Sequence, residues 1–145
     1  MKKPFVIGFY GESNTGKTTI MTKLIRRLIE ENIKIASIKN TDKRISIDQE
    51  NKDTWKHAEA GANLVVFRTP IETDYLFKKQ QSIGEITDKI NQFDNYDLIL
   101  IEGANDKTTP KIRIGNIKER ENTIYTYEND FEKLYSFIKE KIKRR

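Results

Sequence analysis

Short apolar runs alternate along this chain with segments of helical periodicity. Residues 5–10 form an apolar, β-prone run, and residues 16–31 repeat apolar side chains along one helical face. Asn32 ends this predicted helix, and a second strand is predicted at residues 33–38. Strand, helix and strand in this order indicate a βαβ unit with parallel strands and a right-handed crossover.

The same alternation continues to the end of the chain. A short helix is predicted over residues 53–60, with Asp53 and Thr54 as its caps and Gly61 as its end, and the Asn-Asp pair at 129–130 is predicted to cap a final helix. The other predicted elements are strands at 63–68, 74–77, 97–103, 111–114 and 123–127 and a helix at 82–93. The pattern predicts an α/β fold with a mostly parallel central sheet and a small β extension.

The turn between the first strand and the first helix matches the phosphate-binding P-loop, G-x-x-x-x-G-K-[ST]. Gly11 and Gly16 let the backbone turn sharply and approach phosphate oxygens, and the helix N-terminus favours an anion. Lys17 adds a cation for the β- and γ-phosphates, and the Thr18 hydroxyl is a ligand for Mg²⁺. The predicted nucleotide-binding residues of this loop are Gly11, Glu12, Ser13, Asn14, Thr15, Gly16, Lys17, Thr18 and Thr19. The motif between a strand and a helix predicts the three-layer fold of P-loop NTPases.

A carboxylate after a buried strand is the second part of the predicted site. Residues 98–101 are all apolar, and Glu102 follows them at the carboxyl end of the strand. We therefore expect Glu102 to act with Thr18 on Mg²⁺, directly or through water, and with Lys17 as the catalytic pair. Gly103 is expected to let the backbone pass close to the γ-phosphate. Asp97 begins the same strand, so a structural role at the opposite edge is expected.

The motifs leave the nucleotide base open. No N-K-x-D motif is present, because residues 105–107 carry the right residue types in the wrong order, so the pattern does not separate GTP from ATP. The polar stretch 39–52 follows a strand and is predicted to be a binding loop. The cations that we expect within reach of a phosphate or an anionic partner are Lys39, Lys43, Arg44 and Arg113.

Composition narrows the function classes. The 145 residues predict a single domain, and the absence of cysteine excludes disulfides, thiolate metal sites and cysteine nucleophiles. His57 is the one histidine, which excludes a histidine-based metal cluster. No apolar run approaches the roughly 18 residues of a membrane span, and we expect neither a membrane nor a signal peptide. The natural inference is a cytoplasmic protein.

Three blocks resemble the molybdopterin-guanine dinucleotide biosynthesis protein B (MobB) family. The first block is the P-loop. The second is Ile-Lys-Asn-Thr at 38–41, followed by Asp48, by Lys-Asp-Thr-Trp at 52–55 and by Ala-Gly-Ala at 60–62. The third is the apolar run that ends in Glu-Gly at 102–103. The chain departs from the family at 40–44, where a histidine-rich run is common and no histidine stands here.

The resemblance implies a GTP-binding accessory protein of molybdenum cofactor synthesis with weak GTPase activity. Such proteins are usually dimers and assist a MobA-type guanylyltransferase that attaches GMP to molybdopterin. The expected ligands are therefore GTP and Mg²⁺, and the expected partners are a second copy of the chain, the guanylyltransferase and molybdopterin. The resemblance also places Asp48, Lys52 and Asp53 among the binding residues.

The sequence leaves two alternative functions to consider. A small ATP-dependent kinase or transferase would use Asp48 or Asp53 as the base that accepts a substrate proton, but no arginine-bearing lid is visible. A nucleic-acid-binding protein would use the net charge of +5 and the basic tail, which has five cations in its last seven positions. Such a tail is more often a solvated helix end, so nucleic-acid binding is not expected.

Overall fold

The computed structural model describes residues 2–145, which form two compact units. One unit consists of residues 2–41 and 83–145, and the other consists of residues 42–82. The single-domain organisation expected from the length stays a prediction.

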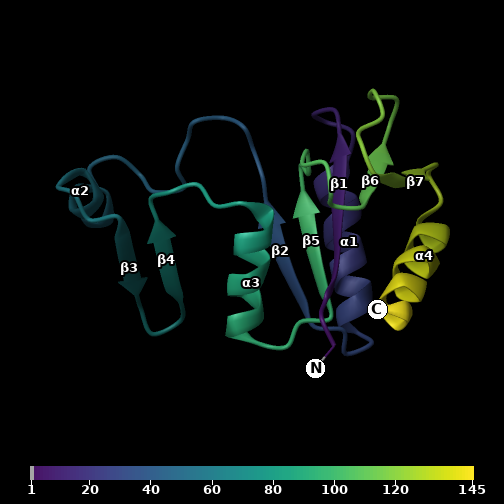
Figure 1. Ribbon diagram of the computed structural model, residues 1–145, viewed down its shortest axis with the longest axis horizontal. Coiled ribbons are helices and arrows are strands. Elements are labelled where there is room, and N and C mark those ends of the chain that lie inside the picture. Colours follow the sequence, from purple (N-terminus) through teal and green to yellow (C-terminus); the bar gives the residue numbers. More distant parts are fainter. Residues whose placement is uncertain (1) are drawn as a thin grey trace. The chain divides into compact units, whose positions relative to one another are not determined.

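The larger unit is built on a five-stranded parallel sheet with the strand order β2-β5-β1-β6-β7 (Figure 1). Its strands are β1 (Phe5–Gly11), β2 (Ile35–Lys39), β5 (Leu98–Glu102), β6 (Lys111–Ile114) and β7 (Thr123–Tyr127). Because all five strands run in one direction, their carboxyl ends share one edge of the sheet. The loop after β1 and the carboxylate at the end of β5 are therefore brought to the same edge.

Helices cover both faces of this sheet. Leu98 and Leu100 of β5 pack in one apolar cluster with α1 (Lys17–Ile29) and α4 (Phe131–Arg144). Ile99 and Ile101 pack in a second cluster with Ile83 of α3 (Ile83–Phe93). Alternate residues of one strand thus face opposite helical layers, as expected for a parallel sheet that is buried on both sides. The predicted three-layer α/β fold with a mostly parallel central sheet is confirmed.

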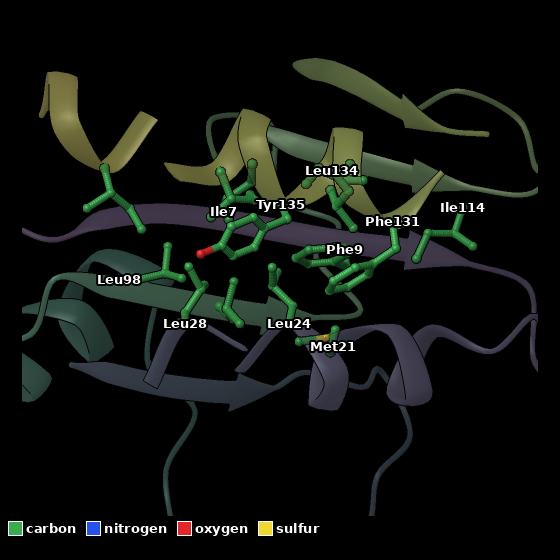
Figure 2. Packing of buried hydrophobic residues seen from close by; sticks show 14 residues of the cluster. Ile7, Phe9, Met21, Leu24, Leu28, Leu98, Ile114, Phe131, Leu134 and Tyr135 are labelled. Carbon is green, nitrogen blue, oxygen red and sulfur yellow. The ribbon is translucent and has the colours of Figure 1, made fainter. Parts of the chain in front are cut away.

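The main core lies between the central strand and the two helices of one face. Figure 2 shows Ile7 and Phe9 of β1 beside Leu24 of α1 and Leu134 of α4. All four side chains are fully buried. The core therefore fixes the start of α1 relative to β1, which sets the shape of the loop between them.

The amino end of the sheet is held by polar contacts of Asp97. The backbone N–H of Lys34 donates to Oδ2 of Asp97 at 2.8 Å, and Nη2 of Arg145 donates to its Oδ1 at 2.6 Å. These bonds join the starts of β2 and β5 to the end of α4. The structural role expected for Asp97 is confirmed.

The smaller unit is a helix followed by a β-hairpin. Its elements are α2 (Asp53–Glu59), β3 (Leu64–Arg68) and β4 (Thr73–Phe77), and the two strands are antiparallel. The predicted small β extension is confirmed. The N-cap predicted at Asp53 and Thr54 is wrong, because Lys52 is the N-cap and no side chain caps the helix, whereas Gly61 follows the C-cap Ala60 with a φ of 122°, as its predicted role at the helix end requires. The Thr54 hydroxyl donates instead to Oδ1 of Asp48 at 2.8 Å, which ties the helix to the preceding loop.

At the final helix the capping prediction is confirmed. The N–H of Lys133 donates to Oδ1 of Asp130 at 3.1 Å, and Asn129 takes a left-handed conformation just before it.

Within residues 2–145 no helix has both the length and the apolar character needed to cross a membrane.

Candidate nucleotide-binding site

The P-loop occupies the turn between the end of β1 and the start of α1. Gly16 is the N-cap of α1 with φ of 83°, a left-handed conformation that suits glycine. Asn14 is also left-handed, with φ of 66°. Gly11 has no positive φ, but a Cβ there would lie 2.6 Å from the carbonyl oxygen of Ile114 on β6. The sharp turn predicted at Gly11 is therefore wrong, and this glycine allows two strands to approach closely.

Lys17 lies over the loop that precedes it. Its Nζ donates to the carbonyl oxygen of Gly11 at 2.9 Å and to that of Glu12 at 3.2 Å. Thr15 closes the same turn, because its hydroxyl donates to the Glu12 carbonyl at 2.6 Å. The ammonium group is thus held at the mouth of the loop, among backbone groups at the N-terminus of a helix.

The predicted metal-binding pair comes together. The Thr18 hydroxyl donates to Oε1 of Glu102 at 2.8 Å, and Oε2 of the same carboxylate is paired with Nζ of Lys39. The sheet register causes this meeting, because β5 lies between β1 and β2 and Lys39 stands directly opposite Glu102. The Glu102 side chain is 11% exposed, whereas that of Lys39 is 69% exposed.

Electrostatics keep the Glu102 carboxyl ionised. Burial alone would raise its pKa, but the hydrogen bonds from Lys39 and Thr18 outweigh burial, and the pKa lies below its ordinary value. A carboxylate and a hydroxyl are hard oxygen donors of the kind that Mg²⁺ binds together with water and phosphate oxygens. Among residues 2–145 there is no cluster of three or more His, Cys, Asp or Glu side chains suited to a metal. The Thr18 hydroxyl and the Glu102 carboxylate fit an Mg²⁺ ion whose other ligands come from a nucleotide and water.

Gly103 makes room for a neighbouring backbone. Its φ is 84°, and a Cβ at this position would lie 2.5 Å from the carbonyl oxygen of Asn40. Nδ2 of Asn40 donates to the Gly103 carbonyl at 2.9 Å, and its backbone N–H donates to the Glu102 carbonyl at 2.9 Å. The carboxyl ends of β2 and β5 are thereby tied together. The close neighbour found at Gly103 is thus Asn40, and the expected approach to a γ-phosphate stays a prediction.

The other predicted binding residues lie in the smaller unit. Asp48 has a side chain only 4% exposed, and its Oδ2 accepts a hydrogen bond from Nζ of Lys78 at 3.0 Å. The hydrogen bonds from Lys78 and Thr54 lower the pKa of Asp48. Lys52 and Asp53 stand at the start of α2 and line, with Asp48, a cavity of about 970 Å³ beside the hairpin. The structure brings Lys39 and Glu102 to the P-loop and places these three residues in the other unit.

A cavity of about 980 Å³ lies beside the P-loop and was missed by the sequence analysis. It is an open cavity between the start of α1 and the carboxyl ends of β6 and β7. Its lining residues are Thr15, Gly16, Thr19, Ile20, Arg113, Ile114, Gly115, Asn116, Thr126, Tyr127, Glu128 and Asn129. Apart from the P-loop and Arg113, nothing in the sequence marked these positions as parts of a binding site, because they come from separate segments that only the sheet brings together.

Lys111 is a second feature without a sequence signal. This strand residue is fully buried, and its Nζ donates to the carbonyl oxygens of Thr109 and Glu121 at 2.8 and 2.7 Å. Burial lowers the pKa of Lys111. Asp106 accepts hydrogen bonds from the backbone and hydroxyl of Thr109 nearby, at 2.9 and 2.7 Å. These contacts tie together the segments that precede β6 and β7.

Comparison with known proteins identifies the family. The sequence model for "Molybdopterin guanine dinucleotide synthesis protein B" matches residues 6–140. The chain is 33% identical over 119 residues to the "Molybdopterin-guanine dinucleotide biosynthesis adapter protein" of Haemophilus influenzae, which covers 74% of this chain and 61% of that protein. It is 28% identical over 111 residues to the protein of the same name from Escherichia coli, covering 74% of this chain and 63% of that protein.

Solved structures agree at the level of the fold. A crystal structure of Bacillus subtilis MobB superposes with a TM-score of 0.71 at 17% identity, over 94% of this chain and 96% of that one. Among the curated relatives, the matched region spans 40% to 63% of the relative's length. With the family model matching nearly the whole chain, the protein belongs to the MobB family, as its sequence motifs predict.

Proposed function

We propose that this protein binds GTP with Mg²⁺ at the P-loop and Glu102 and serves as an adapter in molybdopterin guanine dinucleotide synthesis. The observation that carries the proposal is the 2.8 Å contact between Thr18 and Glu102, beside a P-loop, in a chain of the MobB family. This contact joins the two halves of a phosphate-and-metal site that lie on neighbouring strands.

In this proposal, the loop from Gly11 to Thr19 holds the phosphates. Its backbone N–H groups and the N-terminus of α1 bind phosphate oxygens, and Lys17 adds a positive charge. The Lys17 ammonium now bonds to the loop's own carbonyl oxygens, so it exchanges those contacts for phosphate oxygens on binding. Charge-assisted bonds to phosphate are the stronger ones, which favours this exchange.

Thr18 and Glu102 hold the magnesium ion in this proposal. When bound, Mg²⁺ neutralises charge on the β- and γ-phosphate oxygens. Thr18 supplies its hydroxyl, and Glu102 supplies a carboxylate that Lys39 now pairs with. We infer slow GTP hydrolysis, because Glu102 and Lys17 are occupied with binding and no further base was identified among the motif residues.

The adapter role is supported by the names of the curated relatives, which are described as biosynthesis adapter proteins. The proposed partners are a guanylyltransferase and molybdopterin, in the cytoplasm. The residues proposed for the smaller unit are Asp48, Lys52 and Asp53, which line its cavity. The cavity mixes apolar side chains with charged ones, and its carboxylates (Asp48, Asp53, Glu72 and Asp74) outnumber its cations (Lys52 and Arg68).

A second copy of this chain is the proposed occupant of one face of the hairpin. The cross-strand pairs Leu64–Phe77 and Val66–Tyr75 share that face, and their side chains are 41% to 57% exposed. Val65 on the opposite face is 5% exposed. A two-stranded hairpin with an open apolar face is marginal alone, so pairing of two hairpins would supply the missing cover.

Titration calorimetry with GTP and ATP, each with Mg²⁺ and with a chelator, tests the nucleotide assignment. We expect GTP to bind more tightly than ATP and the Lys17→Ala variant to lose most of this affinity. Lys3→Ala is the matched control, because Lys3 is exposed and precedes β1 at the amino end of the sheet. A clear preference for ATP would reject the GTP assignment, and unchanged affinity in Lys17→Ala would reject the P-loop role.

The adapter role has its own test. Purified guanylyltransferase from the same organism is assayed for molybdopterin guanine dinucleotide with and without this protein and GTP. We expect a higher yield with the protein and no gain with Lys17→Ala. An equal yield in all three reactions would contradict the adapter proposal while leaving nucleotide binding intact.

A further inference from the structure

The cavity beside the P-loop lies on the opposite side of β1 from the metal-binding pair. Glu102 ends β5, which flanks β1 on one side, whereas β6 and β7 lie on the other side. Thr15, Gly16 and Thr19 belong to the P-loop segment and also line the cavity, so the cavity adjoins the phosphate-binding loop. A nucleotide whose γ-phosphate and metal face Glu102 would therefore extend its nucleoside towards β6 and β7.

The size of this cavity suits such a group. Its volume of about 980 Å³ lies at the upper end of the range for small-molecule sites. Part of its lining is apolar and suits a flat base, and this part consists of Ile20, Ile114 and Tyr127. The remaining side chains are polar and differ in kind, with a guanidinium on Arg113, amides on Asn116 and Asn129, and a carboxylate on Glu128.

Two of these polar groups are not used by the protein itself. Nε of Arg113 is buried and has no hydrogen-bond partner within the described chain. Glu128 takes part in no hydrogen bond or ion pair among residues 2–145. By contrast, the carboxylate of Asp130, two positions further on, is committed to the N-terminus of α4. Of the two carboxylates in this turn, Glu128 is the one that lines the cavity and has no hydrogen-bond or ion-pair partner among the described residues.

The bases differ in the edge that they would present to this carboxylate. Guanine carries two adjacent donors, N1–H and the N2 amine, which one carboxylate can accept together. Adenine presents an N6 amine donor beside an unprotonated N1, whose lone pair faces a carboxylate unfavourably. Glu128 is exposed in this structure, and a bound base would cover its carboxylate. A polar group that is covered and left unpaired costs more than a good pair gains, so a site of this kind discriminates by rejection.

We propose that the cavity binds the guanine base and that the Glu128 carboxylate accepts hydrogen bonds from its N1–H and its N2 amine. The inference rests on the proposed nucleotide function and adds the residue that selects the base. Glu128 supplies the acceptor, and Arg113 and Asn116 supply donors for the acceptor atoms of guanosine. The selectivity for GTP that the N-K-x-D motif gives other proteins then comes from the carboxyl ends of β6 and β7.

Direct titration calorimetry with GTP, ITP, XTP and ATP, all with Mg²⁺, tests the assignment. In the wild type we expect GTP to bind roughly tenfold or more tightly than ITP, which lacks the N2 amine. Glu128→Gln should bind GTP roughly tenfold to 100-fold more weakly, because the charged acceptor is lost. It should also gain affinity for XTP, because the new amide can donate to the oxygen that replaces the amine.

Glu119→Gln is the matched control, since Glu119 is exposed, lies outside the cavity lining and changes the net charge equally. Thermal melting shows whether each variant is folded. An unchanged order of affinities in a folded Glu128→Gln variant would overturn this inference and leave the P-loop proposal standing. A wild type that binds no nucleoside triphosphate would overturn both, and a wild type that prefers ATP would overturn this inference and the GTP assignment.

Discussion

The hydroxyl of Thr18 lies 2.8 Å from Oε1 of Glu102, although 84 positions separate the two residues in the chain. One follows β1 and the other ends β5, and the parallel register of these strands places them side by side. The proposed metal site can therefore be tested by comparing nucleotide binding with and without Mg²⁺.

In the proposed site, Glu102→Gln should weaken nucleotide binding only when Mg²⁺ is present. The amide keeps the shape of the side chain but is a poor magnesium ligand, so we expect roughly a tenfold loss of affinity with Mg²⁺, of the order of one lost charge-assisted contact. Affinity in a chelator should stay within about a factor of two to three. Calorimetric titrations under both conditions measure the difference, and an equal loss in both would argue against metal binding by Glu102.

Gly103→Ala should destabilise the larger unit. Alanine would carry the strain of a positive φ and would also place its Cβ 2.5 Å from the Asn40 carbonyl. Gly115→Ala is a matched control, because its φ of 83° is the same and its nearest neighbour is 3.7 Å away. We expect a loss of about 1–2 kcal/mol from the conformation in both variants and a clearly larger loss in Gly103→Ala. Urea unfolding measures both, and equal losses would show that the Asn40 contact is easily relieved.

Stability should fall in acid partly through Asp106. Burial would raise the pKa of this carboxyl, but hydrogen bonds from Thr109 and Thr108 outweigh burial, and the folded-state pKa lies below its ordinary value. A lowered folded-state pKa contributes stability above the unfolded-state pKa, near 3.9, and this contribution is lost as the pH falls below it. Asp106→Asn should therefore be less stable than the wild type at pH 7, with the difference shrinking towards pH 3.

Denaturant unfolding at several pH values between 7 and 3 measures this trend. Asp88→Asn serves as the control, because the Asp88 side chain is exposed on α3 and takes part in no hydrogen bond or ion pair of the described chain. A difference between Asp106→Asn and the wild type that stays constant with pH would mean that the carboxylate charge does not contribute.

The hairpin face gives a prediction about assembly. If a second copy covers Val66 and its neighbours, the Val66→Lys variant should shift the protein from dimer towards monomer, because a buried lysine there would lack a partner. Ile29→Lys is the control, since Ile29 is 54% exposed at the end of α1. Light scattering coupled to size exclusion reports the masses. A wild type that is monomeric at all concentrations would reject the dimer proposal.

Local signals explain what could be predicted from the sequence. The P-loop and the apolar run before Glu102 are contiguous patterns, and the parallel βαβ rule brings their ends to one edge of the sheet. The burial of Lys111 has no such signal, because it depends on carbonyl oxygens of Thr109 and Glu121 that the loops supply.

Predictions failed where a residue type has more than one use. Thr54 is a common capping residue, yet its hydroxyl bonds to Asp48, and Lys52 caps the helix without a side-chain contact. Gly11 has no positive φ, and its lack of a Cβ serves the neighbouring β6. The cavity beside the P-loop could not be predicted from the sequence, because separate segments contribute its walls.

The contact between Gly103 and Asn40 also sets a rule for how sequences of this kind can diverge. The atom that excludes a Cβ at position 103 is the backbone carbonyl of residue 40, which every amino acid possesses. Exchanging the side chain at position 40 therefore leaves the restriction at position 103 unchanged. Relatives that keep this backbone path should retain glycine at the position of Gly103, whichever residue stands at the position of Asn40.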